Sequence, residues 1–76
     1  MNEYIKILEK AINEKLRNIK IKVCRRYDYY AIDMEAVLGE TIMGTMGTIQ
    51  TSMSRKELIQ TLEAIKRVLW YEETKQ

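Results

Sequence analysis

The stretch Met53-Ser54-Arg55-Lys56-Glu57-Leu58 marks a change in the spacing of apolar residues, from alternating to helical. Ser54 can accept a hydrogen bond from the Glu57 amide while the Glu57 carboxylate reaches back to the Ser54 amide. Met53 can pack on Leu58 across the same turn, so a capping box and a hydrophobic staple coincide. The sequence predicts that a helix begins here.

This helix is expected to run from Ser54 to about Glu73 and to form the main core element. Its apolar residues recur at intervals of three and four, and further apolar residues flank them on both sides. The stripe consists of Leu58, Leu62, Ile65 and Leu69, with Ile59 and Trp70 on one side and Val68 on the other.

The other end of the chain shows the same spacing. A helix is predicted from Asn2, as its N-cap, to about Arg17. Ile7 falls off its stripe, and we expect it to be exposed, since single apolar residues on surfaces are common. The stripe consists of Ile5, Leu8, Ile12 and Leu16.

Between the helices, two segments alternate apolar and polar residues, as strands with one buried face do. The first runs from Ile19 to Cys24 and the second from Tyr30 to Val37. Arg26-Tyr27-Asp28-Tyr29 is predicted to form a four-residue hairpin loop, because no Asn-Gly or Asp-Gly marks a tight turn. The resulting register puts apolar residues opposite each other on one face and opposite charges on the other. The pairs are Val23 with Ile32, Ile21 with Met34, Lys22 with Asp33, and Lys20 with Glu35.

A third strand is predicted from Thr41 to Thr51, after a break at Leu38-Gly39-Glu40. The triplets Met43-Gly44-Thr45 and Met46-Gly47-Thr48 repeat at three residues rather than two. Glycine weakens a strand interior and often marks a bulge, so we expect a bulge here.

These elements predict an α+β two-layer sandwich of order α-β-β-β-α, with an antiparallel three-stranded sheet and both helices on one face. Residues 1–76 are expected to form a single domain, with 72–76 fraying. The uncovered face is where a function would lie. Its expected residues are Lys20, Lys22, Cys24, Ala31, Asp33, Glu35 and Val37.

Composition narrows the class of protein. The 76 residues carry a formal net charge of +2, with 32% charged and 46% hydrophobic residues, as globular chains do. The lone Cys24 cannot form an intramolecular disulfide, which favours a reducing compartment. The beginning of the chain lacks a signal-peptide pattern and no apolar run could span a membrane, so we expect a cytoplasmic protein.

The residue types argue against an enzyme. With no histidine in the chain, the commonest general base near neutral pH is missing, and Cys24 has no imidazole to generate its thiolate. Lysines opposite Asp33 and Glu35 would hold both carboxylates ionised instead of separating their pKa values. We expect no catalytic residues, no metal site and no cofactor.

Protein binding, by self-association or to another protein, is the favoured function. Methionines adapt to irregular partners, an edge strand can pair with another strand, and Trp and Tyr are enriched at binding centres. The candidate protein-binding residues are Met43, Met46, Ile49, Trp70 and Tyr71. For Trp70 the alternative is closure of the core over the first helix, with Tyr71 solvated.

Nucleic-acid binding is the alternative function. A basic block over residues 20–26 is followed by three tyrosines over residues 27–30. Cations that meet phosphates beside aromatic rings that stack on bases suit the binding of single-stranded nucleic acid. Residues 27–54 hold four acids and no base, so internal pairing of this block is also open. The candidate residues are Lys20, Lys22, Arg25, Arg26, Tyr27, Tyr29, Arg55 and Lys56.

The segment Ser54-Arg55-Lys56-Glu57, at the end of an α-β-β-β-α order, resembles the basic helix opening of the double-stranded-RNA-binding domain. The resemblance implies that Arg55 and Lys56 would meet phosphates across a major groove. Ile59 stands where that family has a third lysine, and the first hairpin contains no histidine or proline.

Overall fold

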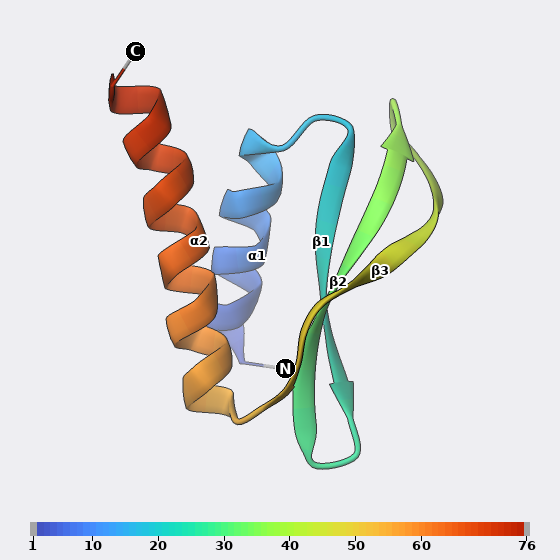
Figure 1. Cartoon of the computed structure of the whole chain (residues 1–76), viewed down its shortest axis with the longest axis vertical. Coiled ribbons are helices and arrows are strands. Elements are labelled where there is room, and N and C mark those ends of the chain that lie inside the picture. The colour runs from blue at the N-terminus through green and yellow to red at the C-terminus, as the bar shows by residue number, and fades with distance from the viewer. Residues whose placement is uncertain (1, 76) are drawn as a thin grey trace.

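The computed structural model describes the backbone of residues 2–75 and the side chains of residues 2–72. The elements follow the order α1 (Glu3–Lys15), β1 (Ile19–Arg26), β2 (Tyr29–Leu38), β3 (Thr41–Met53) and α2 (Arg55–Lys75). The strands form one antiparallel sheet of order β1-β2-β3, and Figure 1 shows both helices on the same side of it. The predicted α+β sandwich is confirmed, as one small domain.

Both helices begin as predicted. The Asn2 side chain accepts a hydrogen bond from the Tyr4 amide at 2.7 Å. The Ser54 amide donates to the Glu57 carboxylate at 3.0 Å, and the Glu57 amide donates to the Ser54 hydroxyl at 3.2 Å. The bond from the Ser54 amide does most to lower the pKa of Glu57. The segment from 72, expected to fray, continues α2 as far as Lys75, and Gln76 lies outside the described residues.

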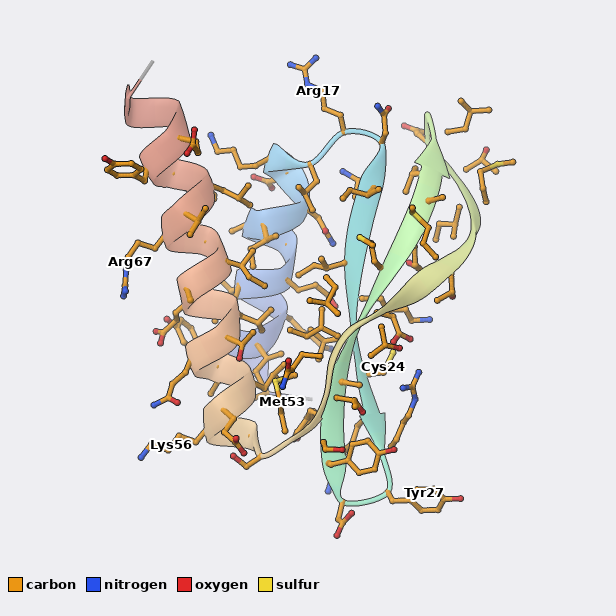
Figure 2. All side chains as sticks on the ribbon, in the orientation of Figure 1. Arg17, Cys24, Tyr27, Met53, Lys56 and Arg67 are labelled. Carbon is orange, nitrogen blue, oxygen red and sulfur yellow. The ribbon has the colours of Figure 1, made fainter. Side chains whose placement is uncertain are left out.

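The core lies between the helices and the side of the sheet that faces them. Met53 and Leu58, the two residues of the predicted staple, are both buried in it, and Figure 2 shows Met53 between the start of α2 and the sheet. The helices lie side by side and run in the same direction (Figure 1). The buried cluster consists of Ile5, Leu8, Ile12, Ile21, Val23, Ile32, Met53, Leu58 and Leu62.

The predicted register of β1 and β2 is confirmed at all four pairs, but the predicted four-residue loop is wrong. Arg26 pairs with Tyr29, which leaves a turn of two residues, Tyr27 and Asp28. Tyr27 has a φ of 56°, a left-handed conformation that normally selects glycine or asparagine, so the sequence carried no signal for it. The second hairpin turns at Gly39, whose φ of 63° suits glycine.

β3 pairs irregularly with β2. The register shifts at four points along the pairing, so the expected bulge occurs repeatedly. No helix among the described residues is long and apolar enough to span a membrane.

Candidate functional site

β3 is the most exposed element of the structure. Every residue from Thr41 to Ser52 is exposed, and only Met53 at its end is buried. The strand contains no charged residue. Its large exposed side chains, with their exposed fractions, are Ile42 (61%), Met43 (62%), Met46 (57%) and Ile49 (45%), and Leu38 (71%) lies beside them at the end of β2. Sequence analysis selected Met43, Met46 and Ile49 but missed Ile42 and Leu38.

The period of three in the sequence of β3 corresponds to its bulges. Met43, Met46 and Ile49 have no partner on β2, and each occupies the extra position at a register shift. In each repeat the next two residues pair with successive β2 residues. Three residues of β3 therefore span the same distance as two residues of β2.

This ratio assigns the other β3 residues to the two faces of the sheet. Side chains directly opposite each other in an antiparallel pair lie on the same face. Ile42, Thr45 and Thr48 lie opposite Val37, Glu35 and Asp33, which belong to the face away from the helices. Gly44, Gly47 and Gln50 lie opposite Ala36, Met34 and Ile32, on the face toward the helices.

The edge formed by β1, in contrast, is covered by α1. The Asn13 side chain donates to the Ile21 carbonyl at 3.0 Å and accepts from the Ile21 amide at 2.8 Å. Four residues earlier on the same helix, the Glu9 carboxylate accepts from the Val23 amide at 2.7 Å. Two polar side chains thus take the place of a neighbouring strand. Sequence analysis missed both, although each directly follows a residue of the buried stripe.

Lys20 lies at this covered edge, and its side chain bonds to the end of α1 instead of to a neighbouring strand. Its ammonium group donates to the carbonyl oxygens of Asn13 at 2.6 Å and Leu16 at 2.8 Å, at the end of α1. Cations are favourable at helix C-termini. The expected Lys20–Glu35 ion pair is therefore wrong, although the two residues are opposite each other as predicted.

Asp33 joins the three strands on the face away from the helices. Its carboxylate pairs with Arg26 at 2.9 Å, rather than with Lys22 as expected, and accepts from the Thr48 hydroxyl at 2.9 Å. The thiol of Cys24 donates to it at 3.4 Å. The bond from Thr48 contributes most to the lowered pKa of Asp33, and burial followed by the Asp33 bond raises the pKa of Cys24. A thiol held protonated is a poor nucleophile.

A shallow hollow of about 520 Å³ is lined by residues of α1, of β1 and of the face away from the helices. Its lining carries both signs of charge, from Lys20 and Lys22 on β1 and from Glu9, Glu35 and Glu40 around them. Ile42 of β3 forms part of its wall. The mixed lining does not favour any one class of charged ligand.

Trp70 and Tyr71 belong to the C-terminal part of α2, and Figure 1 shows that this end of the helix lies away from β3. The Trp70 ring is half-buried, with the ammonium groups of Lys15 and Lys66 at 4.7 and 5.4 Å from its centroid. Tyr71 is 61% exposed. The two groups of predicted protein-binding residues therefore do not form one surface.

The predicted nucleic-acid residues divide in the same way. Figure 2 shows Tyr27 at the tip of the first hairpin and Lys56 at the start of α2, both at one end of the molecule. Arg26 is held by Asp33, and the Arg25 guanidinium lies 5.7 Å from the centroid of the Tyr30 ring. Tyr29 is half-buried, and Lys22 and Arg55 are exposed.

Among the described residues, no group of three acidic, cysteine or histidine side chains could hold a metal ion. Comparisons with protein-family models, with curated proteins and with solved structures give no match to this chain.

Proposed function

We propose that this protein is a non-enzymatic binding module that contacts another protein chain through β3. The observation that carries the proposal is the contrast between the two edges of the sheet. α1 covers the β1 edge with hydrogen bonds, whereas residues 41–52 of β3 are all exposed and, among the described residues, only β2 pairs with them.

An edge of this kind favours strand addition. Natural proteins protect edge strands with lysine, proline, bulges, short length or a covering segment, since an open edge recruits other strands. β3 has 13 residues, no lysine and no proline, so bulges are the one device of this kind that it carries. Main-chain hydrogen bonds along such an edge supply affinity, and the adjacent side chains supply specificity.

The bulged residues are suited to making side-chain contacts along this edge. Met43, Met46 and Ile49 project from positions that no β2 residue opposes. Unbranched methionine side chains adapt to the shape of a partner. A row of exposed apolar side chains beside open main-chain groups is the combination that a protein strand can use and that a phosphate backbone cannot.

The proposal is tested by affinity capture from an extract of the native cell, with nuclease-treated and untreated arms. The immobilised bait is the wild-type chain, the double variant Met43→Lys/Met46→Lys, or the double variant Arg55→Glu/Lys56→Glu. We expect a protein that wild type and the Arg55/Lys56 variant retain, that nuclease does not release, and that the methionine variant loses. Retention that the methionine variant keeps would contradict the proposal.

The second candidate is nucleic-acid binding at the end of the molecule that carries Tyr27 and Lys56. Its support is that Tyr27, 95% exposed, and the basic start of α2 lie at the same end (Figure 2). In the same experiment, this function requires that nuclease release the retained material and that Arg55→Glu/Lys56→Glu abolish it. Affinity should then fall steeply as salt rises.

A further inference from the structure

We propose that the strand that pairs with β3 is β3 of a second copy of this chain, antiparallel, with the two-fold axis at Thr45. This inference rests on the proposed function, because it uses the same edge. It adds the identity of the partner and the register of the pairing.

The charge pattern favours a second copy. In a two-fold antiparallel pairing each residue lies near residues of its own strand, so charges on the strand would repel their copies. β3 contains no charged residue, although 32% of the chain is charged. Selective binding of a different protein commonly uses complementary charges, and this edge offers none. An uncharged edge therefore suits self-pairing.

The direction of the backbone groups identifies which β3 residues can pair outward. The amides of Ile21 and Val23 donate to α1, so they point away from β2. Since backbone groups alternate along an antiparallel strand, Ile32 and Met34 opposite them turn toward β3 and meet Gln50 and Gly47. The β3 residues that oppose the intervening β2 residues then point outward, and Thr45 is the central one of the set Ile42, Thr45 and Thr48.

An axis at Thr45 also matches the side chains of the two copies. Ile42 then lies opposite Thr48 of the second copy, so residues of the same face meet. Met43 lies opposite Gly47 of the second copy, and Met46 opposite its Gly44. Apart from the two residues that flank each glycine, no atom lies within 4 Å of the place where its side chain would begin. Each bulged methionine therefore meets an unfilled position.

The size of the interface sets the expected affinity. Residues 41–49 run beside about six β2 residues because of the bulges, so they would pair over about 20 Å. A single sheet edge of about 10 Å depth offers roughly 200 Å² of contact per copy along that length. Burial of the methionine and isoleucine side chains adds to this. The total stays below the roughly 1,200 Å² of standard specific interfaces, so we expect micromolar rather than nanomolar dissociation.

Disulfide trapping tests the register directly, in a Cys24→Ser background. Thr45→Cys places the two thiols at the axis, where paired Cα atoms about 5.5 Å apart allow a disulfide. Thr41→Cys is the matched control, since its two copies would be about 18 Å apart in this register. We expect at least tenfold more covalent dimer from Thr45→Cys under mild oxidation. Equal yields from the two variants, or none from either, would overturn the proposed pairing.

Sedimentation equilibrium of the uncross-linked chain is the second measurement. We expect a dimer of wild type at high micromolar concentration and at least a tenfold weaker association of Thr45→Pro, which removes an outward amide, and of Met46→Lys. If Thr45→Pro does not fold, Met46→Lys still tests the pairing, because Met46 is exposed and its substitution should leave the fold intact. Circular dichroism checks the fold of both variants. A wild-type monomer at millimolar concentration contradicts self-pairing. If the methionine variant still loses a captured protein, only the identity of the partner fails and the proposed function stands.

Discussion

The two edges of this sheet are treated in opposite ways. At β1, the Asn13 side chain of α1 binds the outward amide and carbonyl of Ile21. The Glu9 carboxylate of the same helix binds the outward amide of Val23. At β3, no described segment other than β2 lies along the strand. The edges belong to the same three-stranded sheet, so the difference comes from where the helices pack. A partner for β3 would complete what α1 already does for β1.

Composition follows the same division. β1 alternates apolar residues with lysines and arginine, which are typical of a strand with one solvated face, whereas β3 is free of charge over 13 residues. The four predictions below test the contrast between the covered and the bare part of the molecule.

The largest expected difference is between truncations of apolar side chains in the two parts. Leu62 is fully buried, so Leu62→Ala should lower the free energy of unfolding by about 2–5 kcal/mol. Met46 is 57% exposed, so Met46→Ala should change it by no more than about 0.5 kcal/mol in the monomer. Urea unfolding at low micromolar concentration measures both. A large loss for Met46→Ala would mean that β3 stabilises the monomer.

The sequence predicted the covered part of the molecule in detail. Helix caps and the capping box are local patterns, and the β1–β2 register followed from matching apolar and charged residues on two faces. The tight turn at Tyr27 and the partners of Asp33 and Lys20 could not be predicted. A positive φ at tyrosine has no residue signal, and long side chains choose among several partners only once the elements are placed.

The second prediction concerns the cover of the β1 edge. Asn13→Ala removes both bonds to Ile21 and leaves its partly buried amide and carbonyl to find water, so we expect a loss of about 2 kcal/mol. The matched control is Glu14→Ala, the adjacent exposed residue of α1, with a change within about 0.5 kcal/mol. Hydrogen exchange should show faster exchange of the Ile21 amide in Asn13→Ala only. Unchanged exchange would show that the edge needs no cover.

The contacts that cover the β1 edge could not be predicted from the sequence. Glu9 and Asn13 are four residues apart, beside the buried stripe of α1, and they look like ordinary flanking polar residues. Their role depends on the angle at which α1 crosses β1. Met43, Met46 and Ile49 could be proposed from the sequence, because methionine side chains adapt to irregular partners and an edge strand can pair with another strand.

The third prediction uses the pH dependence of stability. Hydrogen bonds from Thr48 and other donors hold the pKa of Asp33 below its ordinary value of about 3.9. A lowered folded-state pKa contributes stability that is present above about pH 4 and is lost as pH falls through the folded-state value. Asp33→Asn should lower the free energy of unfolding by about 1–2 kcal/mol at pH 7. The difference from wild type should shrink below pH 4, as urea titrations across this range would reveal. A constant difference would assign the loss to packing instead of charge.

The smallest effect separates two glycines that stand in identical Met-Gly-Thr triplets. Gly44 has a φ of 147°, which side chains rarely adopt, whereas Gly47 does not have a positive φ. Because no atom outside the flanking residues lies within 4 Å of either position, we expect backbone conformation to decide the cost in the monomer. Gly44→Ala should lose about 1 kcal/mol, and Gly47→Ala should be neutral or gain up to about 0.5 kcal/mol through the unfolded state.

The same pair separates the monomer from the dimer. If Met43 of a second copy packs at Gly47, then Gly47→Ala weakens association severalfold in sedimentation while leaving the monomer as stable as wild type. A Gly47→Ala chain that associates as well as wild type would place the methionines elsewhere. The two halves of the repeat thus test different properties: Gly44 is required by the path of β3 itself, and Gly47 by the space that β3 leaves for a partner.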